Sequence, residues 1–211
     1  MTEVFSGVLQ YEDSALSASD VLLLDGNGNV LAATVPDSFG HYRINAPEGA
    51  AAWVIARTFQ PVIGLRAVEA HHSRRIDFRI LRTETVSLAG KIECPDGFEG
   101  EGFQLDLIPA SLTGFPANGR QALFSVGAGP GIRTAFYSHV IPGNTFELRV
   151  LLGAYELRIY RSMDGPKGSG KSDLLNSSIR EPDGSIRPDR FGWWPLVANK
   201  DHRLTILMQK P

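Results

Sequence analysis

The sequence has a single cysteine, Cys94, and no lysine among its first 90 residues. One thiol cannot form an internal disulfide, and it cannot supply the several thiolates of a cysteine-based zinc site. Apolar runs are short, as at residues 21–24, whereas a membrane-spanning helix needs roughly 20 consecutive apolar residues. These shortages exclude a disulfide-stabilised fold and predict that the chain does not enter a membrane.

The chain also lacks an excess of charge of either sign. It has 21 Lys and Arg and 23 Asp and Glu, for a net charge of −2. A dedicated nucleic-acid binder needs clustered basic surface to neutralise phosphates, so this balance predicts no nucleic-acid partner. The opening residues Met-Thr-Glu-Val contain neither a basic region nor an apolar leader segment. From that absence we expect a cytoplasmic location.

Turn-forming residues are abundant, with 22 Gly and 13 Pro. Between them, apolar and polar residues alternate with a period of two, as at residues 41–45 and 75–80, and no long stretch has helical spacing. Residues 25–29, Asp-Gly-Asn-Gly-Asn, separate two apolar runs and supply the residue types that a tight hairpin turn needs. The pattern therefore predicts many short strands joined by turns.

The second half repeats the pattern of the first. Residues 86–92 echo residues 4–8, and residues 145–160 repeat the strand, turn and strand of residues 41–56. An internal repeat of this length predicts two copies of one sandwich-like unit, over residues 1–82 and 83–211. The second copy is the more divergent, and a long loop at residues 161–202 separates its last two strands.

The first half resembles the carboxypeptidase regulatory-like domains, which are transthyretin-like (prealbumin-like) β-sandwiches. The resemblance rests on residues 6–8, the hairpin at residues 25–30, the D-x-x-G-x-Y-x-I run at residues 37–44 and the P-x-G turn at residues 47–49. The second half keeps only a G-x-Y element at residues 153–155. The resemblance implies an all-β protein of two tandem, immunoglobulin-like sandwiches of seven strands each, with little or no helix. It implies an architecture more than an activity.

Two glycine-rich strings imitate nucleotide-binding motifs. Residues 165–172 match G-x-x-x-x-G-K-[ST] literally, but no βαβ unit follows them. Residues 127–131, Gly-Ala-Gly-Pro-Gly, lack both the spacing and the helix of a dinucleotide fingerprint. We interpret both strings as surface loops and predict no cofactor.

Other candidate chemical groups are isolated in the sequence. Asp25 begins a D-x-N-x-N series that lacks the glycine and glutamate of an EF-hand loop, which favours a hairpin turn and leaves only a weak cation site open. A sandwich of this shape could join Lys91 to Asn199 by an isopeptide bond, provided that a buried acid lies beside the pair. We predict no metal site, because the five histidines have neither H-x-H nor H-x-x-x-H spacing.

The densest aromatic cluster lies at residues 187–196, inside the long loop. Its aromatic and cationic side chains are those that interface anchors use. We predict a non-catalytic binding or scaffolding protein that recognises a protein or small-molecule partner through Arg190, Phe191, Trp193 and Trp194. Homo-oligomer formation is left open.

Two other functions and one structural alternative remain. A small-molecule enzyme could use His71, His139 or His202 as general base in a cleft between the domains. A carbohydrate-binding module would expose Trp193 and Trp194 on a shallow groove. Alternatively, the two tryptophans fill the end of a sandwich and bind nothing.

Overall fold

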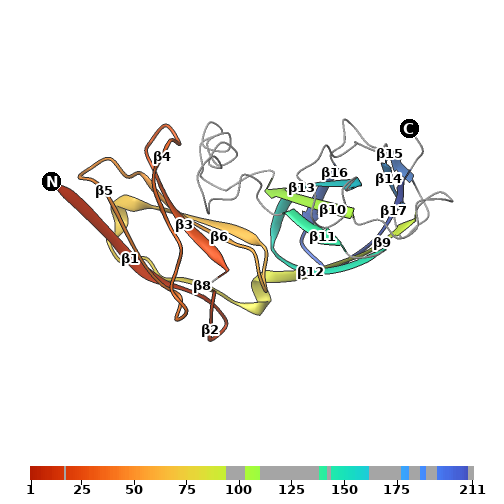
Figure 1. Cartoon of the computed structure of the whole chain (residues 1–211), viewed down its shortest axis with the longest axis horizontal. Helices are drawn as coiled ribbons and strands as arrows, with labels where there is room; N and C mark the ends of the chain where they lie inside the picture. The colour runs from red at the N-terminus through yellow and green to blue at the C-terminus, as the bar shows by residue number, and fades with distance from the viewer. Residues whose placement is uncertain are drawn as a thin grey trace. The chain divides into compact units, whose positions relative to one another are not determined.

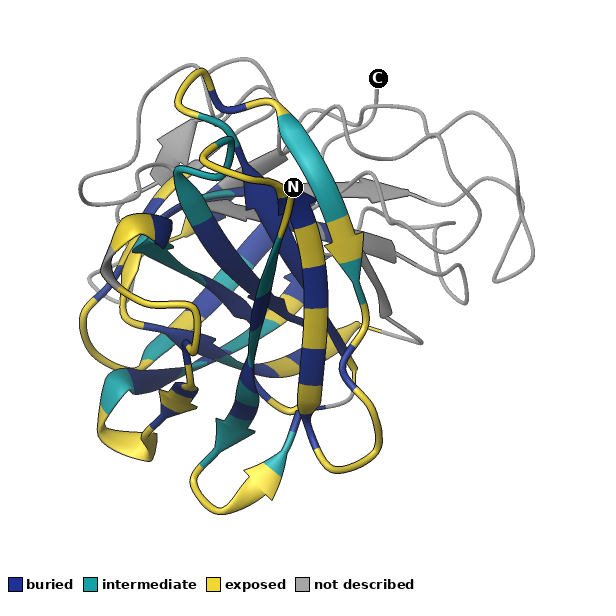
Figure 2. Cartoon of the chain, turned by 90° about the vertical axis from the view of Figure 1, so that its left-hand side faces the viewer, coloured by how far each residue is buried: buried dark blue, intermediate teal, exposed yellow. Residues whose placement is uncertain are grey.

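The alternating pattern at residues 41–47 forms a strand in the computed structural model of the chain. Residues of this strand, β5 (His41–Pro47), are exposed and buried in strict turn, which Figure 2 shows as alternating bands. The structure describes residues 1–16, 18–93, 103–109, 138–141, 144–161, 177–180, 186–188 and 194–208. Among the described residues, Met1–Thr85 belong to one compact unit and the residues from Val86 onward belong to a second. The bounds 1–82 and 83–211 for two homologous domains stay a prediction.

The first unit consists of two four-stranded sheets (Figure 1). One sheet joins β2, β1 and β5 in that order, with β8 parallel to β1, and the other has the order β4-β3-β6-β7. In addition to β5, the strands described in this unit are β1 (Thr2–Tyr11), β2 (Ser14–Ala15), β3 (Ser19–Leu24), β4 (Val30–Thr34), β6 (Trp53–Thr58), β7 (Gly64–Glu69) and β8 (Phe78–Ile80).

Apolar side chains from both sheets are buried in the first unit. The most deeply buried include Phe5, Leu9, Val21, Leu23, Val54 and Ala56, each 0% exposed. Strand β1 alternates along its length, whereas β3 is buried throughout. Each fully buried Leu or Phe side chain stabilises the fold by about 1.5–3 kcal/mol.

The second unit also contains two sheets, of orders β11-β10-β13-β16 and β12-β9-β17-β14-β15. Its described strands are β9 (Thr85–Glu93), β10 (Phe103–Pro109), β11 (Ser138–Ile141), β12 (Thr145–Leu151), β13 (Gly153–Arg161), β14 (Ser177–Arg180), β15 (Ile186–Pro188), β16 (Trp194–Ala198) and β17 (His202–Met208).

The two units share one topology. The order β4-β3-β6-β7 of the first unit corresponds to β11-β10-β13-β16 of the second. In each unit the first strand pairs with the last in parallel, β1 with β8 and β9 with β17. The first strand also lies beside β5 in the first unit and beside β12 in the second. Seven strands thus correspond between the units in the described part of the chain, and this confirms the all-β fold class of two sandwiches. The helical residues described are two short 3₁₀ turns, η1 (Ala70–His72) and η2 (Arg82–Glu84).

Residues 161–202 differ from the predicted long loop. Three short strands lie between β13 and β17: the hairpin of β14 and β15, and β16, which occupies the position of β7 in the first unit. These strands are three to five residues long, and two of them contain proline. Such short, proline-containing runs give almost no period-two signal, which explains why the sequence pattern predicted a loop.

Candidate functional site

The predicted binding residues fall at the edge of what the structure describes. Arg190, Phe191 and Trp193 lie outside the described residues. Trp194 is the first residue of β16, and its backbone pairs in register with Leu157 of β13. The aromatic sequence therefore leads directly into a strand instead of lying wholly within a loop.

Strand β16 presents apolar side chains at the edge of its sheet. Among the described strands it pairs with β13 alone. Leu196 and Ala198 are buried, whereas Val197 is 59% exposed and Pro195 is also exposed. Leu152, which directly precedes β13, is 48% exposed, and the next residue, Gly153, pairs with Ala198. Exposed apolar side chains of this kind suit recognition of a partner.

The histidines considered as general bases lie on separate elements. His71 lies in η1, where its Nε2 is 3.0 Å from Glu69 Oε2. His139 pairs with Leu105 in the β10–β11 ladder, and His202 Nε2 is 2.8 Å from the Val197 carbonyl oxygen. Within the described residues, no group of three His, Cys, Asp or Glu side chains is placed to hold a metal ion.

The Asp25 carboxylate serves the β3–β4 turn and not a cation. Its Oδ1 accepts the backbone N–H groups of Asn27 (2.9 Å) and Asn29 (2.8 Å), and its Oδ2 accepts the Asn29 side-chain amide (2.9 Å). The side-chain and backbone donors of Asn29 are the main reason that the pKa of Asp25 is lowered. With its oxygens committed to these donors, the carboxylate is poorly placed to coordinate calcium.

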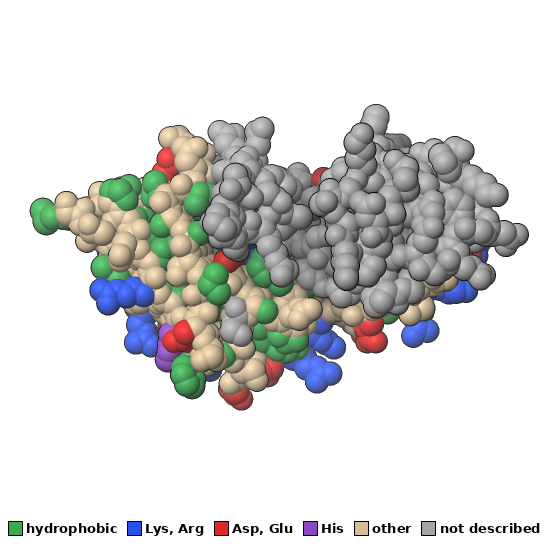
Figure 3. Space-filling view, viewed as in Figure 1, with side chains coloured by type: hydrophobic (Ala, Val, Ile, Leu, Met, Phe, Trp, Pro, Cys, Tyr) green, Lys and Arg blue, Asp and Glu red, His purple; other side chains and the backbone are tan. Residues whose placement is uncertain are grey.

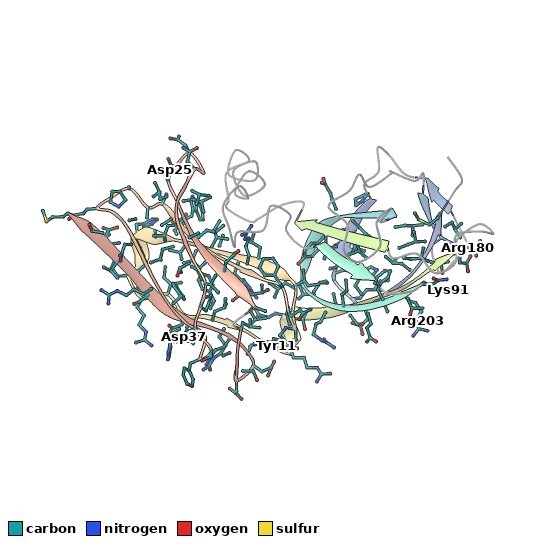
Figure 4. The ribbon with its side chains drawn as sticks, viewed as in Figure 1. Tyr11, Asp25, Asp37, Lys91, Arg180 and Arg203 are labelled. Atoms are coloured by element: carbon teal, nitrogen blue, oxygen red, sulfur yellow. The ribbon has the colours of Figure 1, made fainter. Side chains whose placement is uncertain are left out.

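Asp37 organises the turn before β5 in the same way, and Figure 4 labels both aspartates. Its Oδ1 accepts the backbone N–H groups of Phe39 and His41, each at 2.9 Å. Gly40 completes the turn with a φ of +81°, which other residues adopt only under strain. The backbone N–H of His41 contributes most to lowering the pKa of Asp37. In this turn the Phe39 residue is 72% exposed to solvent.

We expect the first unit to lose stability in acid through these two turns. A carboxyl whose pKa is lower in the folded state stabilises the fold above its unfolded pKa of about 3.9. That stabilisation disappears as the pH falls through the lowered pKa. Urea titrations measure the free energy of unfolding at pH 7 and at pH 3. The difference between these two values should be smaller for Asp25→Asn than for the wild type. Asp13→Asn, in an exposed turn, is the matched control and should behave as the wild type.

Lys91 lies on the outside of its sheet and not in the core. Its side chain is 61% exposed, and Nζ is 3.5 Å from Glu93 Oε1. Arg180 is also 3.5 Å from Glu93, and Figure 4 labels both cations. Lys91 pairs with Thr205, and Asn199 lies in the exposed turn that follows β16. An isopeptide bond between Lys91 and Asn199 would need a buried pair, and this exposed lysine does not provide one.

Three sequence features lie outside the described residues: the glycine-rich strings at 165–172 and 127–131, and Cys94. In the described part of the chain, no helix has the length and apolar character needed to cross a membrane.

Comparison with known proteins finds similarity only to solved structures. No family model matches the sequence, and no curated protein matches it. The major pilin protein T-13 from Streptococcus pyogenes serotype GAS131465 is a similar solved structure, with 10% identity over 100% of this chain and 97% of that chain and a TM-score of 0.33. The shaft pilin spaA from Lactobacillus rhamnosus GG has 9% identity over 100% and 99% of the two chains and a TM-score of 0.29.

The sheets of the two units confirm the β-sandwich part of the resemblance. No family model supports the carboxypeptidase regulatory-like family. The predicted cytoplasmic location is wrong, because the similar structures are pilins, which are surface proteins. That prediction rested on the residue types of the first four positions, and these do not determine where a folded sandwich functions.

Proposed function

We propose that this protein is a non-catalytic binding module that captures a protein or small-molecule partner through residues 187–196. Arg190, Phe191, Trp193 and Trp194 are the proposed contacts. The observation that supports this proposal is the edge strand β16, where the aromatic sequence continues into the exposed Pro195 and Val197. An edge strand with apolar side chains can add main-chain hydrogen bonds to the contacts of aromatic anchors.

The titratable side chains of the first unit support a non-catalytic role. Asp25 and Asp37 accept backbone N–H groups in turns, and Asp20 is paired with Arg57. The Glu84 side chain accepts a hydrogen bond of 2.9 Å from the backbone N–H of Leu81, the residue that precedes η2. These carboxylates hold the fold together, whereas a general base must be able to reach a substrate.

The double variant Trp193→Ala/Trp194→Ala tests the proposed contacts. We expect it to lose capture of the partner from an extract of the native host while its thermal midpoint stays within about 2 °C of the wild type. Val35→Ala, which shortens an exposed apolar side chain of the first unit, is the matched control and should retain capture. Unfolding of the double variant would instead show that the tryptophans fill the core.

An enzymatic function predicts a different result. Stoichiometric metal in the purified protein, or a thermal shift with one class of metabolite, would favour a small-molecule enzyme over a binding module.

A further inference from the structure

The outer side of the β5-β1-β8 sheet carries three arginines in the first unit. Phe5 and Leu9 of β1 point into the core, so Ser6, Val8 and Gln10 face outward. Ser6 pairs with Arg43 of β5 on one side and forms a bridge to Arg75 on the other. Gln10 pairs with Arg79 of β8. We call the surface formed by Arg43, Arg75 and Arg79 the Arg face. In Figure 3, blue basic side chains lie beside a purple histidine at the lower left, on the first unit.

The Arg face has more positive than negative charge. Among the described residues no carboxylate pairs with Arg43 or Arg79. Two acids lie near the Arg face. Asp77 Oδ2 is 3.4 Å from Arg75 Nε, and its Oδ1 accepts the Val8 N–H at 3.0 Å. Asp37 Oδ2 is 3.6 Å from Nδ1 of His41, at the start of β5. The Arg75 and Asp77 side chains are 73% and 50% exposed, so solvent weakens the attraction between them.

Three other arginines of the first unit have acidic partners, unlike Arg43 and Arg79. Arg57 pairs with Asp20, Arg66 with Glu84 and Arg74 with Glu3.

The spacing of the arginines suits a chain with widely separated anions. Arg43 and Arg75 flank Ser6 from neighbouring strands, so their backbones lie about 10 Å apart. Arg79 lies level with Gln10, four residues along β1 from Ser6 and hence about 13 Å away. Phosphates in nucleic acids recur every 3.4 Å along each strand, which is much denser. An acidic polysaccharide, with a charge on every sugar or every second sugar, fits the wider spacing better.

An exposed aromatic ring stands beside the Arg face. Phe39 is 72% exposed, and its ring centroid is 6.4 Å from that of His41, the first residue of β5. The Asp37 hydrogen bonds fix the turn that presents the ring, so little conformational entropy is lost when a ligand contacts it. An aromatic face next to guanidinium groups can pack against a sugar ring while the arginines bind its acidic groups.

We propose that the Arg face together with Phe39 binds an acidic polysaccharide. This site lies in the first unit and does not depend on residues 187–196, so the tryptophan variants leave it intact.

Binding of the full chain to hyaluronan, which has one carboxylate on every second sugar, tests the proposal, with uncharged dextran as the reference polymer. The wild type should bind hyaluronan, and its affinity should fall with added salt as counterions are released. Arg43→Ala, Arg75→Ala and Arg79→Ala should each weaken binding about threefold, and the triple variant roughly 30-fold. Each loss should also reduce the slope of log affinity against log salt.

Three further variants separate this site from a general charge effect. Arg66→Ala removes the same charge from the other sheet of the unit and should leave binding unchanged. Phe39→Ala should weaken binding about fivefold while the salt slope stays the same, because it removes no charge. Asp77→Asn keeps the acceptor for the Val8 N–H and removes the acid, so it should strengthen binding about threefold.

The proposal fails if the wild type does not bind hyaluronan at low salt, or if Arg66→Ala weakens binding as much as Arg43→Ala. Equal or stronger binding to single-stranded DNA or to anionic phospholipid vesicles would also overturn it, in favour of a nucleic acid or a membrane surface. Circular dichroism of each variant confirms that a loss of binding is not a loss of fold.

Discussion

Gly7→Ala is expected to lower the free energy of unfolding of the first unit by about 3 kcal/mol or more. A Cβ atom on Gly7 would stand 1.8 Å from the carbonyl oxygen of Ile76 and 3.0 Å from Cε1 of Tyr42, its cross-strand partner. Real Cβ atoms do not approach a backbone oxygen so closely, so the backbone around Ile76 would have to move.

Two hydrogen bonds oppose that movement. The Ile76 N–H donates to the Ser6 carbonyl at 2.9 Å, and the Tyr42 hydroxyl donates to the Ile76 carbonyl at 2.6 Å. Burial raises the pKa of Tyr42, so the hydroxyl keeps its proton and remains a donor. Relieving the clash breaks buried hydrogen bonds, which is why the expected loss exceeds that of an ordinary small-to-large substitution.

Urea denaturation measures this loss, with Gly26→Ala as the matched control. A Cβ on Gly26 meets nothing within 4 Å, so this variant should stay within about 0.5 kcal/mol of the wild type. If both variants unfold at the same urea concentration, the close approach of Ile76 to Gly7 does not exist in solution. Gly90 of β9 shows a related arrangement, because a Cβ there would stand 2.3 Å from the Phe146 ring.

Arg57→Met is expected to destabilise the first unit by about 3–5 kcal/mol. Arg57 is 1% exposed in β6, and its Nε donates to Asp20 Oδ1 at 2.6 Å while a second guanidinium nitrogen contacts Oδ2. Asp20 is itself 8% exposed. Removing the guanidinium leaves a buried carboxylate without its counter-charge, and the desolvation of that carboxylate is then uncompensated.

A double-mutant cycle isolates this effect. Adding Asp20→Asn to Arg57→Met removes the uncompensated charge and should recover part of the loss, because the two side chains act as a unit. Arg75→Met breaks the exposed pair with Asp77 and should lower stability by less than about 1 kcal/mol. Equal losses for Arg57→Met and Arg75→Met would show that burial of the first pair contributes nothing.

Local signals in the sequence were sufficient for most strands and turns. The alternation at residues 41–47 gives β5, and Asp25 and Asp37 form the turns that their residue types predict. The repeat predicted from residues 86–92 and 145–160 corresponds to β9, β12 and β13, which occupy the positions of β1, β5 and β6. These features depend on side chains a few residues apart, so a linear pattern records them.

Other features depend on residues far apart in the chain. Arg57 follows the apolar residues 54–56, but nothing near it shows that Asp20, 37 residues earlier, neutralises it. The Arg face brings Arg43 and Arg75 to opposite sides of Ser6, whereas alternation in the sequence distinguishes inward from outward residues without showing which strands are neighbours. The outward residues of the same strands were the signal that could have found this surface.

The sequence by itself determined that the chain forms short strands in two similar sandwiches, because period-two alternation and turn-forming residues act locally. Only the tertiary structure decided which strands lie side by side, and with them the buried Arg57–Asp20 pair, the close approach of Ile76 to Gly7 and the Arg face. It also showed that residues 161–202 contain β14, β15 and β16, which gain their hydrogen bonds from β17 and β13. Such short strands are stabilised by pairing with neighbouring strands and not by their own residues. The local sequence therefore does not predict them.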